Sequence, residues 1–400
     1  MRDLIYFDHA AATPLDPRVL AAMMPYFEAQ YANPSSIYHF AQKARQGVDE
    51  AREEVGKILD CSPREILFTS CGTESNNFFI LGAAAALAHS AKNSSTKGHI
   101  ITTKIEHESV LKPIEYLESQ GFEVTYLDVD KNGLLKPDDV EYALRDDTIF
   151  VSIIYANNEI GTVQPIAEIA ERIKKFREKR GKAVELPFFH TDACQAAPYL
   201  DISIKNLGVD AMTLNGSKIY GPKGVGVLYV KEGITLVPQM FGGGQEYRKR
   251  SGTENVPAIV GFAKALSLVQ QNRQVESSRL TKLRDKLIDG VLEKIPRSRL
   301  NGDRLCRLPN NVNVSFSGIE GESILLQLDM HDIAASSGSA CTSGALEPSH
   351  VIRALGLGDE WTHSSTRFTL GHSTTEKEVD AVLAALPSII KELSQSSPFL

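Results

Sequence analysis

The stretch VDAMTLNGSKIYGPKGVGVLYV, residues 209–230, contains two apolar segments separated by a turn that is rich in glycine. Short apolar segments bounded by turn residues are typical of strands that are buried in a sheet. Lys218 directly follows the first of these segments, beside Gly216 and Ser217. Such a lysine is either solvated and idle, or it is a reactive amine at the edge of a sheet, where open α/β proteins bind their ligands.

Strand and helix patterns alternate on the N-terminal side of this stretch. Helix patterns occur in TESNNFFILGAAAALAHSAK and AEIAERIKKFREKRG, and further strand patterns occur in EILFTS, HIITTKIEHES, FEVTYLDVD, TIFVSIIYANNEIG and ELPFFHTDACQA. This alternation predicts an α/β protein in which helices cover a mainly parallel seven-stranded sheet.

The pattern changes after about Pro257, where a long polar helical stretch is followed by the strand NNVNVSFSG and the helix GESILLQLD. A chain of 400 residues is also long enough for more than one hydrophobic core. We therefore predict a large domain at residues 17–258 and a smaller α/β domain at residues 259–400, with the N-terminal segment 1–16 returning to the smaller domain.

Composition excludes several classes of function. The formal net charge of −7 leaves no basic excess with which to neutralise nucleic-acid phosphates or a membrane surface. The start of the chain, MRDLIYFDHAAATP, resembles neither a secretory signal nor a transit peptide, so a cytoplasmic protein is expected. The five cysteines are odd in number and none are paired as C-x-x-C, which argues against a disulfide framework or a metal site.

Other polar residues follow the predicted strands. In FTSCGTESNN, Gly72 allows close approach to a ligand, and Thr73 is an acceptable N-cap for a helix whose N-terminus could bind an anion. A routine capped turn explains this stretch equally well. Asp192 and Gln195 follow a strand in HTDACQA, and an acid at such a place commonly caps the next helix. His107 in IEHES, taken alone, is most simply a structural histidine.

Taken together, these strand ends contain an anion site, an acid and a lysine. Pyridoxal 5'-phosphate (PLP) requires this combination, because its phosphate, its ring nitrogen and its aldehyde each need one of the three. The turn GPKGVG lacks the G-x-x-x-x-G-K-[ST] pattern of a nucleotide-binding loop. The sequence therefore predicts a PLP enzyme.

Motifs along nearly the whole chain resemble those of the cysteine desulfurases that carry their nucleophile on a long loop, within the fold-type I PLP enzymes. The most diagnostic motif is SSGSACTSGALEPSH at residues 336–350, which contains Cys341. The other motifs are YFDHAAATP, NPSSIYHF, TSCGTESNN, EHESVL, NNEIGTVQPI, HTDACQA, SKIYGPKGVG, RSGTEN, PNNVNVSFSGIEGES and HSSTRFTLGHSTTE.

The resemblance implies a role for each candidate residue of the site. Lys218 would form the Schiff base with PLP, Asp192 would pair with the ring nitrogen, and Gln195 would bond the ring oxygen. His107 would stack on the ring and exchange protons. The remaining roles are phosphate binding by Gly72, Thr73 and Ser217, contact with the phosphate of the other subunit of a homodimer by Thr253, and binding of the substrate carboxylate by Asn157 and Arg367.

The same resemblance implies the reaction and its partners. L-Cysteine would be converted to L-alanine, and a persulfide would form on Cys341, whose serine- and glycine-rich surroundings give the backbone freedom. The sulfur would supply iron–sulfur cluster assembly or tRNA thiolation. The expected partners are therefore an iron–sulfur scaffold or another sulfur acceptor, in transient contact that includes an iron–sulfur cluster bridged through Cys341.

Three alternatives use the same residues differently. A selenocysteine lyase would prefer the selenium substrate, an aminotransferase of the same fold would not need Cys341, and a silent scaffold would not need Lys218. The sequence also departs from the family in two motifs. Asn215 and Ser217 replace the usual serine and histidine before the lysine, and Tyr247 and Arg248 replace a common arginine and glycine.

Overall fold

The computed structural model describes residues 4–90, 97–181, 185–337 and 349–396 of the chain. Its main element is a seven-stranded sheet with the strand order β2-β8-β7-β6-β5-β3-β4. All neighbouring strands from β7 to β4 pair in parallel, and β8 pairs antiparallel with both β2 and β7. The predicted mainly parallel seven-stranded sheet is therefore confirmed. The strands are β2 (Ile66–Thr69), β3 (His99–Thr103), β4 (Glu123–Leu127), β5 (Thr148–Ser152), β6 (Phe188–Asp192), β7 (Ala211–Asn215) and β8 (Gly226–Val230).

The central strands read as continuous apolar segments because both faces of the sheet are covered. Successive residues point to opposite faces, so Phe150 packs in one core cluster and Val151 in the other. The cluster around Phe150 lies beneath α4 (Gly72–Ser90) and α5 (Glu108–Ser119). The other cluster lies beneath α3 (His39–Leu59), α7 (Ile166–Arg180) and α10 (Val256–Gln271), and it continues into the C-terminal part of the molecule.

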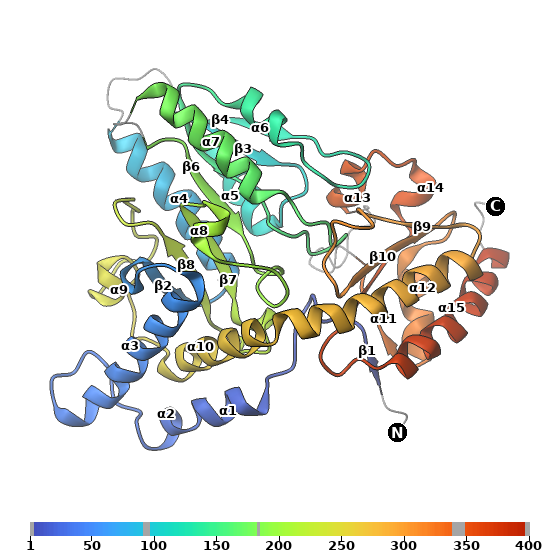
Figure 1. The fold of residues 1–400 in the computed structure, drawn as a ribbon, viewed down its shortest axis with the longest axis horizontal. Coiled ribbons are helices and arrows are strands. Elements are labelled where there is room, and N and C mark those ends of the chain that lie inside the picture. Colours follow the sequence, from blue (N-terminus) through green and yellow to red (C-terminus); the bar gives the residue numbers. More distant parts are fainter. Residues whose placement is uncertain (1–3, 91–96, 182–184, 338–348, 397–400) are drawn as a thin grey trace.

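Short elements complete this part of the fold, and each connects larger ones. They are α1 (Pro17–Met23), α2 (Pro25–Glu28), η1 (Pro63–Glu65), α6 (Pro137–Ala143), α8 (Ile204–Leu207), η2 (Gly216–Lys218) and α9 (Gln245–Arg248). Figure 1 shows α1, α2, α3 and α10 together on one side of the large sheet. No helix within the described ranges has the length and apolar character needed to cross a membrane.

A second, antiparallel sheet of three strands lies in the C-terminal part, with the order β12-β10-β9. It is formed by β9 (Ser298–Leu300), β10 (Asn311–Phe316) and β12 (Ser365–Thr369). The helices α11 (Arg273–Lys294), α12 (Gly321–Met330) and α15 (Glu376–Ser396) lie beside it, with the short α13 (His350–Ala354) and α14 (Asp359–Thr362). Figure 1 shows these elements on the opposite side of the molecule from α3 and α9.

The N-terminal segment connects the two parts. Its strand β1 (Ile5–Tyr6) pairs in parallel with β11 (Ile333–Ala334), and Asp8 bridges to Thr369 of β12. The boundary predicted at residues 258 and 259 falls inside α10, which packs against α1 and α3. We propose instead a boundary near Asn272, between α10 and α11, because each helix then stays with the elements that it contacts.

Candidate active site

Lys218 lies at the carboxyl end of β7, in the single turn η2. Its Nζ donates a hydrogen bond to the carbonyl of Ala11 at 2.5 Å. Asn215 shapes the turn, because its Oδ1 accepts hydrogen bonds from the amide and the hydroxyl of Ser217, both at 3.3 Å. A Cβ on Gly216 would lie 2.6 Å from the carbonyl oxygen of Pro222, so only glycine fits there. The turn therefore fixes the lysine at the edge of the sheet.

Asp192 ends the neighbouring strand β6, where it pairs with Thr213 of β7. Its side chain is buried, and Oδ2 accepts a hydrogen bond from Nδ2 of Asn76 at 2.7 Å. Oδ1 accepts a second one from the amide of Cys194 at 3.0 Å. Asn76 was not predicted from the sequence. The signal that could have identified it is its place in the polar stretch SNN, directly before the apolar stretch FFIL of the same helix. The two hydrogen bonds hold Asp192 in one orientation.

The N-terminus of α4 lies against the ends of both strands. A Cβ on Gly72 would lie 2.8 Å from Sγ of Cys194 and 3.4 Å from Cβ of Asn215. Glycine is therefore required for this close approach. Because α4 begins at Gly72, Thr73 lies within the first turn, and the expectation that Thr73 is the N-cap is wrong by at least one position. The amide of Ser75 already donates to the carbonyl of Cys71, so the helix hydrogen bonds start before Thr73.

His107 is the N-cap of α5. Its Nδ1 accepts a hydrogen bond from the amide of Ser109 at 3.0 Å and lies 2.7 Å from the hydroxyl of the same serine. A backbone amide can only donate, so Nδ1 carries no proton in this arrangement. The neutral ring consequently has its proton on Nε2, which remains as a hydrogen-bond donor.

Asp8, Ala10, Ala11 and Thr13 of the N-terminal segment border the site. The carbonyl of Ala10 accepts a hydrogen bond from Nε2 of Gln195 at 2.9 Å, beside the contact of Ala11 with Lys218. Thr13 donates from its amide and its hydroxyl to the carbonyl of Ser217, at 3.0 and 3.1 Å. Sequence analysis assigned this segment no place in the site, because the residues that it contacts come about 185 to 360 positions later.

Arg367, in β12, is buried and contacts the same segment. Its Nη2 donates to Oδ1 of Asp8 at 2.9 Å, and its Nη1 donates to the carbonyl of Asn158 at 3.0 Å. The side chain of Asp8 is 20% exposed, against 4% for Arg367. The arginine is therefore held in place by a carboxylate that itself reaches the surface.

Asn157 lies in the loop after β5 and is fully buried. Its Nδ2 donates to the carbonyl of Ile105 at 2.8 Å, and its Oδ1 accepts from the amides of Glu159 and Ile160 at 2.9 and 3.0 Å. The amide group thus mainly holds its own loop together. One hydrogen of Nδ2 is left for a ligand, so the predicted role in substrate binding stays a prediction.

Two buried carboxyl groups adjoin the site. Burial raises the pKa of Glu106 to about 8, and among the described residues only its Oε1 has partners, the hydroxyl of Thr103 and the amide of Ile154. Burial also raises the pKa of Glu159, against the opposing effect of a hydrogen bond from the hydroxyl of Ser349. Ser349 is the first described residue after the range 338–348, which contains Cys341, so the candidate nucleophile itself lies outside the described residues.

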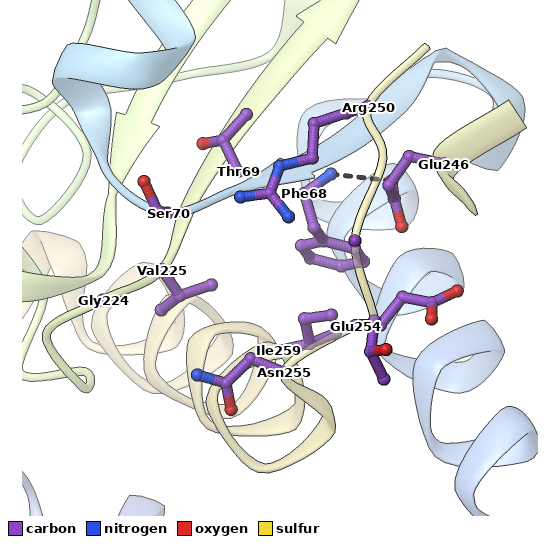
Figure 2. A pocket seen from close by; sticks show the side chains of 12 residues that line it. Phe68, Thr69, Ser70, Gly224, Val225, Glu246, Arg250, Glu254, Asn255 and Ile259 are labelled. Carbon is purple, nitrogen blue, oxygen red and sulfur yellow. Dashed lines mark hydrogen bonds between the residues drawn. The ribbon is translucent and has the colours of Figure 1, made fainter. Parts of the chain in front are cut away.

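Thr253 lies in a different place, in the segment after α9. It lines a pocket together with residues of β2, the turn before β8 and the start of α10, and Figure 2 shows this pocket from close by. Arg250, which also lines this pocket, pairs through its guanidinium with the carboxylate of Glu74 in the first turn of α4. The pocket therefore adjoins the N-terminus of α4 from the side of β2.

Comparison with known proteins is consistent with this geometry. A family model described as aminotransferase class-V matches residues 5–382. Cysteine desulfurase IscS of Dictyoglomus turgidum is 47% identical over 400 residues, which cover 100% of this chain and 98% of that protein. A solved structure described as a NifS-like protein superposes with a TM-score of 0.89 at 34% identity, over 98% of this chain and 100% of the other. Another, described as SspA in complex with cysteine, superposes with a TM-score of 0.77 at 34% identity, over 92% of this chain and 98% of the other.

Proposed function

Since the chain belongs to the aminotransferase class-V family and is a cysteine desulfurase, we propose that it binds PLP on Lys218 and converts L-cysteine to L-alanine and a persulfide on Cys341. The observation that carries this proposal is the meeting of Lys218, Asp192 and Gly72 at the ends of two adjacent strands. Each of these three positions has the residue type that its proposed role requires.

The donor set fits PLP in three places. The helix start at Gly72 leaves no room for a side chain and presents backbone amides, as a phosphate requires. Asp192 is a buried acid held by two hydrogen bonds, as a pyridinium nitrogen requires. The amine of Lys218 lies at the end of the adjacent strand, as the aldehyde requires. When bound, PLP supplies that aldehyde and a ring that takes up negative charge from the substrate Cα.

Three residues of the chain have different roles toward the substrate and the cofactor. Lys218, once free of the cofactor, is the base that takes the proton from the substrate Cα. His107 offers an N–H at Nε2, because Nδ1 accepts a hydrogen bond from the amide of Ser109, and it would donate a hydrogen bond from Nε2 to the cofactor or the substrate. Asp192 would pair with the pyridinium nitrogen, and its orientation is held by the hydrogen bonds from Asn76 and Cys194.

Sulfur transfer needs no external oxidant. The thiolate of Cys341 attacks the sulfur of L-cysteine, the bond between that sulfur and Cβ breaks, and its electron pair remains on Cβ. Cβ then takes up a proton, which gives the methyl group of alanine. Cys194, whose Sγ lies beside Gly72, is no rival nucleophile, because burial raises its pKa well above the ordinary value and keeps it as the thiol.

Arg367 binds the carboxylate of L-cysteine in this proposal. Its planar fork suits a carboxylate, and its two Nη atoms already hold one carboxylate oxygen and one carbonyl. The substrate therefore shares the guanidinium with Asp8 or replaces Asp8 on it. A neighbour in structure that is described as a complex with cysteine supports L-cysteine as the ligand.

Several finer points belong to the same proposal. The active form is a homodimer in which Thr253 contacts the PLP phosphate of the other subunit, and the persulfide passes to an iron–sulfur scaffold or another acceptor protein in the cytoplasm. Of the alternatives, a selenocysteine lyase would share every residue named above. The ratio of the rates on cysteine and selenocysteine distinguishes the two, whereas an aminotransferase would release no sulfur.

The test is a visible spectrum of the purified chain before and after addition of L-cysteine, followed by assays for alanine and sulfide. Lys218→Ala should abolish the visible absorbance of lysine-bound cofactor and all alanine production. Lys223→Ala, which removes an exposed lysine five residues away, is the matched control and should leave both unchanged. Ordinary turnover by the Lys218 variant would refute the proposal.

A further inference from the structure

The turn Glu246–Tyr247–Arg248 has an unusual backbone. The φ angles of its three residues are +45°, +58° and +63°, although none of them is glycine. A left-handed conformation costs about 1–2 kcal/mol for each such residue and persists only where the surroundings impose it. Contacts of this turn must therefore fix it.

Glu246 supplies the first contact. Its buried carboxylate accepts hydrogen bonds from Nη1 and Nη2 of Arg52, at 2.9 and 2.6 Å, and from the amide of Phe68 at 2.9 Å. Arg52 Nη1 also donates to the carbonyl of Ile66 at 2.5 Å. Figure 2 shows the bond between Glu246 and Phe68 at one side of the pocket. One carboxylate thus ties the turn to both α3 and β2.

Tyr247 supplies the second contact. The guanidinium carbon of Arg52 lies 5.1 Å from the centre of the Tyr247 ring and 4.8 Å from that of Phe68. Both distances are typical of cation–π contacts, which strengthen when the cation is desolvated. Arg52 therefore holds two consecutive residues of the left-handed turn.

The chain that leaves this turn is fixed as far as Thr253. Arg250 pairs with both carboxylate oxygens of Glu74, at 2.8 and 3.2 Å. Ser251 donates from its hydroxyl to the carbonyl of Gly243 at 2.8 Å, and the amide of Gly252 donates to Oε1 of Gln245 at 3.1 Å. Thr253 comes next and borders the pocket of Figure 2.

From these contacts we infer that Arg52 and Glu246 are positioning residues for the cofactor of the other subunit. They impose the left-handed turn, and the turn directs Thr253 toward the phosphate held in that subunit. The inference rests on the proposed function, in which Thr253 makes this contact across the dimer. It predicts that loss of the pair in one subunit weakens PLP binding in the other subunit and not in the subunit that carries the substitution, an effect in trans only.

Mixed dimers separate the two directions. In the first dimer, one subunit carries both Glu246→Gln and Lys218→Ala, and the other is unaltered. In the second dimer, one subunit carries Glu246→Gln and the other carries Lys218→Ala. Each dimer has a single Lys218, so the visible absorbance of lysine-bound PLP reports one site, whose affinity follows from titration of the apo form.

We expect PLP to bind about three- to tenfold more weakly in the first dimer, the loss of about one hydrogen bond, and within about twofold of normal in the second. Equal weakening in both dimers, or weakening in the second alone, would overturn the inference. Glu115→Gln, which removes an exposed partner of Lys112, replaces Glu246→Gln in a control pair and should change neither dimer.

Thr253→Ala takes the place of Glu246→Gln in the same two dimers. The comparison then separates failure of the inference from failure of the proposed function. Weakening in trans by Thr253→Ala but not by Glu246→Gln would overturn the positioning role and leave the proposed function standing. A native chain that is monomeric by light scattering, or that forms no absorbance with PLP, would overturn both. If Glu246→Gln fails to fold, Arg52→Lys keeps the charge but not the two-point contact, and should show the same trans-only pattern.

Discussion

Arg52 and Arg367 are both buried arginines paired with a carboxylate from a distant part of the chain, yet the two pairs differ in how completely they are closed. Arg52 uses both Nη atoms on both oxygens of Glu246, and the two side chains are 6% and 3% exposed. Arg367 gives only one Nη to one oxygen of Asp8, whose side chain is 20% exposed. The same pair of residue types thus occurs in a sealed form and in an open form.

This difference suggests what each pair is for. A sealed pair cannot exchange its carboxylate for a ligand, and removal of either partner leaves an uncompensated buried charge. Its value lies in the backbone that it fixes, the turn at residues 246–248. An open pair can share its arginine with a second carboxylate, such as that of L-cysteine. The number of contacts and the exposure of the carboxylate therefore agree with the positioning role that we infer for Arg52 and with the ligand-binding role that we propose for Arg367.

The largest expected effect breaks the sealed pair. Arg52→Leu leaves Glu246 buried without its cation, so the free energy of unfolding should fall by about 3–5 kcal/mol. Urea unfolding at fixed protein and PLP concentrations measures this loss. Arg45→Leu, which removes the cation of an exposed pair on the same helix, should cost less than about 1 kcal/mol. Similar losses of unfolding free energy in the two variants would show that the sealed pair stabilises the fold no more than an exposed pair does.

The next effect concerns Glu106, a buried carboxyl with no cation among its hydrogen-bond partners. Its pKa is about 8 in the folded protein, because of burial, and 4.5 is the ordinary value expected in the unfolded chain. Between these values the folded protein holds the extra proton, so this group makes stability fall as the pH rises, by about 1.4 kcal/mol per pH unit.

Glu106→Gln removes this titration while it keeps a neutral side chain of similar shape. Between pH 5.5 and pH 7.5 the unfolding free energy of the native chain should therefore fall by about 2–3 kcal/mol more than that of the variant. Urea unfolding over this pH range measures it, with the exposed Glu322→Gln as control. Parallel curves for the native chain and the Glu106 variant would contradict the assignment of a proton to Glu106.

A smaller effect is expected when the open pair is altered. Arg367→Lys keeps the charge but cannot hold Asp8 and a second carboxylate by a planar fork. Its kcat/KM for L-cysteine should fall about 10- to 100-fold, mainly through KM, the equivalent of one charge-assisted hydrogen bond. Arg304→Lys, in an exposed pair with Asp289, is the control for the substitution itself. A fall in kcat with unchanged KM would argue against substrate binding by Arg367.

The smallest effect concerns the backbone strain in the left-handed turn that the sealed pair holds in place. Arg248 is exposed and has a φ of +63°. Arg248→Gly should raise the free energy of unfolding by about 0.5–1 kcal/mol, because relief of the strain exceeds the entropy that glycine loses on folding. Arg248→Ala removes the same side chain and keeps the strain, so it should not stabilise. Equal stabilisation by both variants would point to the side chain and not to the backbone.

Sequence reasoning predicted the large sheet well, because each of its strands is a short apolar run bounded by turn residues. It also placed Asp192 and Lys218 at strand ends, since the end of an apolar run is visible in the sequence. The strand β12 was not predicted from its pattern, because STRFT mixes polar residues with a single large apolar one. Its burial comes from neighbours that no local pattern reveals.

The side chains that hold the site were much harder to predict. Asn76 and Asp192 are 116 positions apart, and Arg52 and Glu246 are 194 apart. A buried polar residue has the same letter as an exposed one, and only the three-dimensional partner distinguishes them. The departure at Arg248 was visible as an arginine where the family commonly has glycine, but its meaning became clear only with the positive φ angle.

The N-terminal segment that borders the site has a consequence for the way the protein is made. Asp8, Ala10, Ala11 and Thr13 leave the ribosome long before the residues that they contact, and Asp8 must wait for Arg367, which is synthesised 359 residues later. At about 5–20 residues per second this delay is about 20–70 s. The nascent chain can build the large sheet during that time, but the pair of Asp8 and Arg367 cannot form until β12 has been translated.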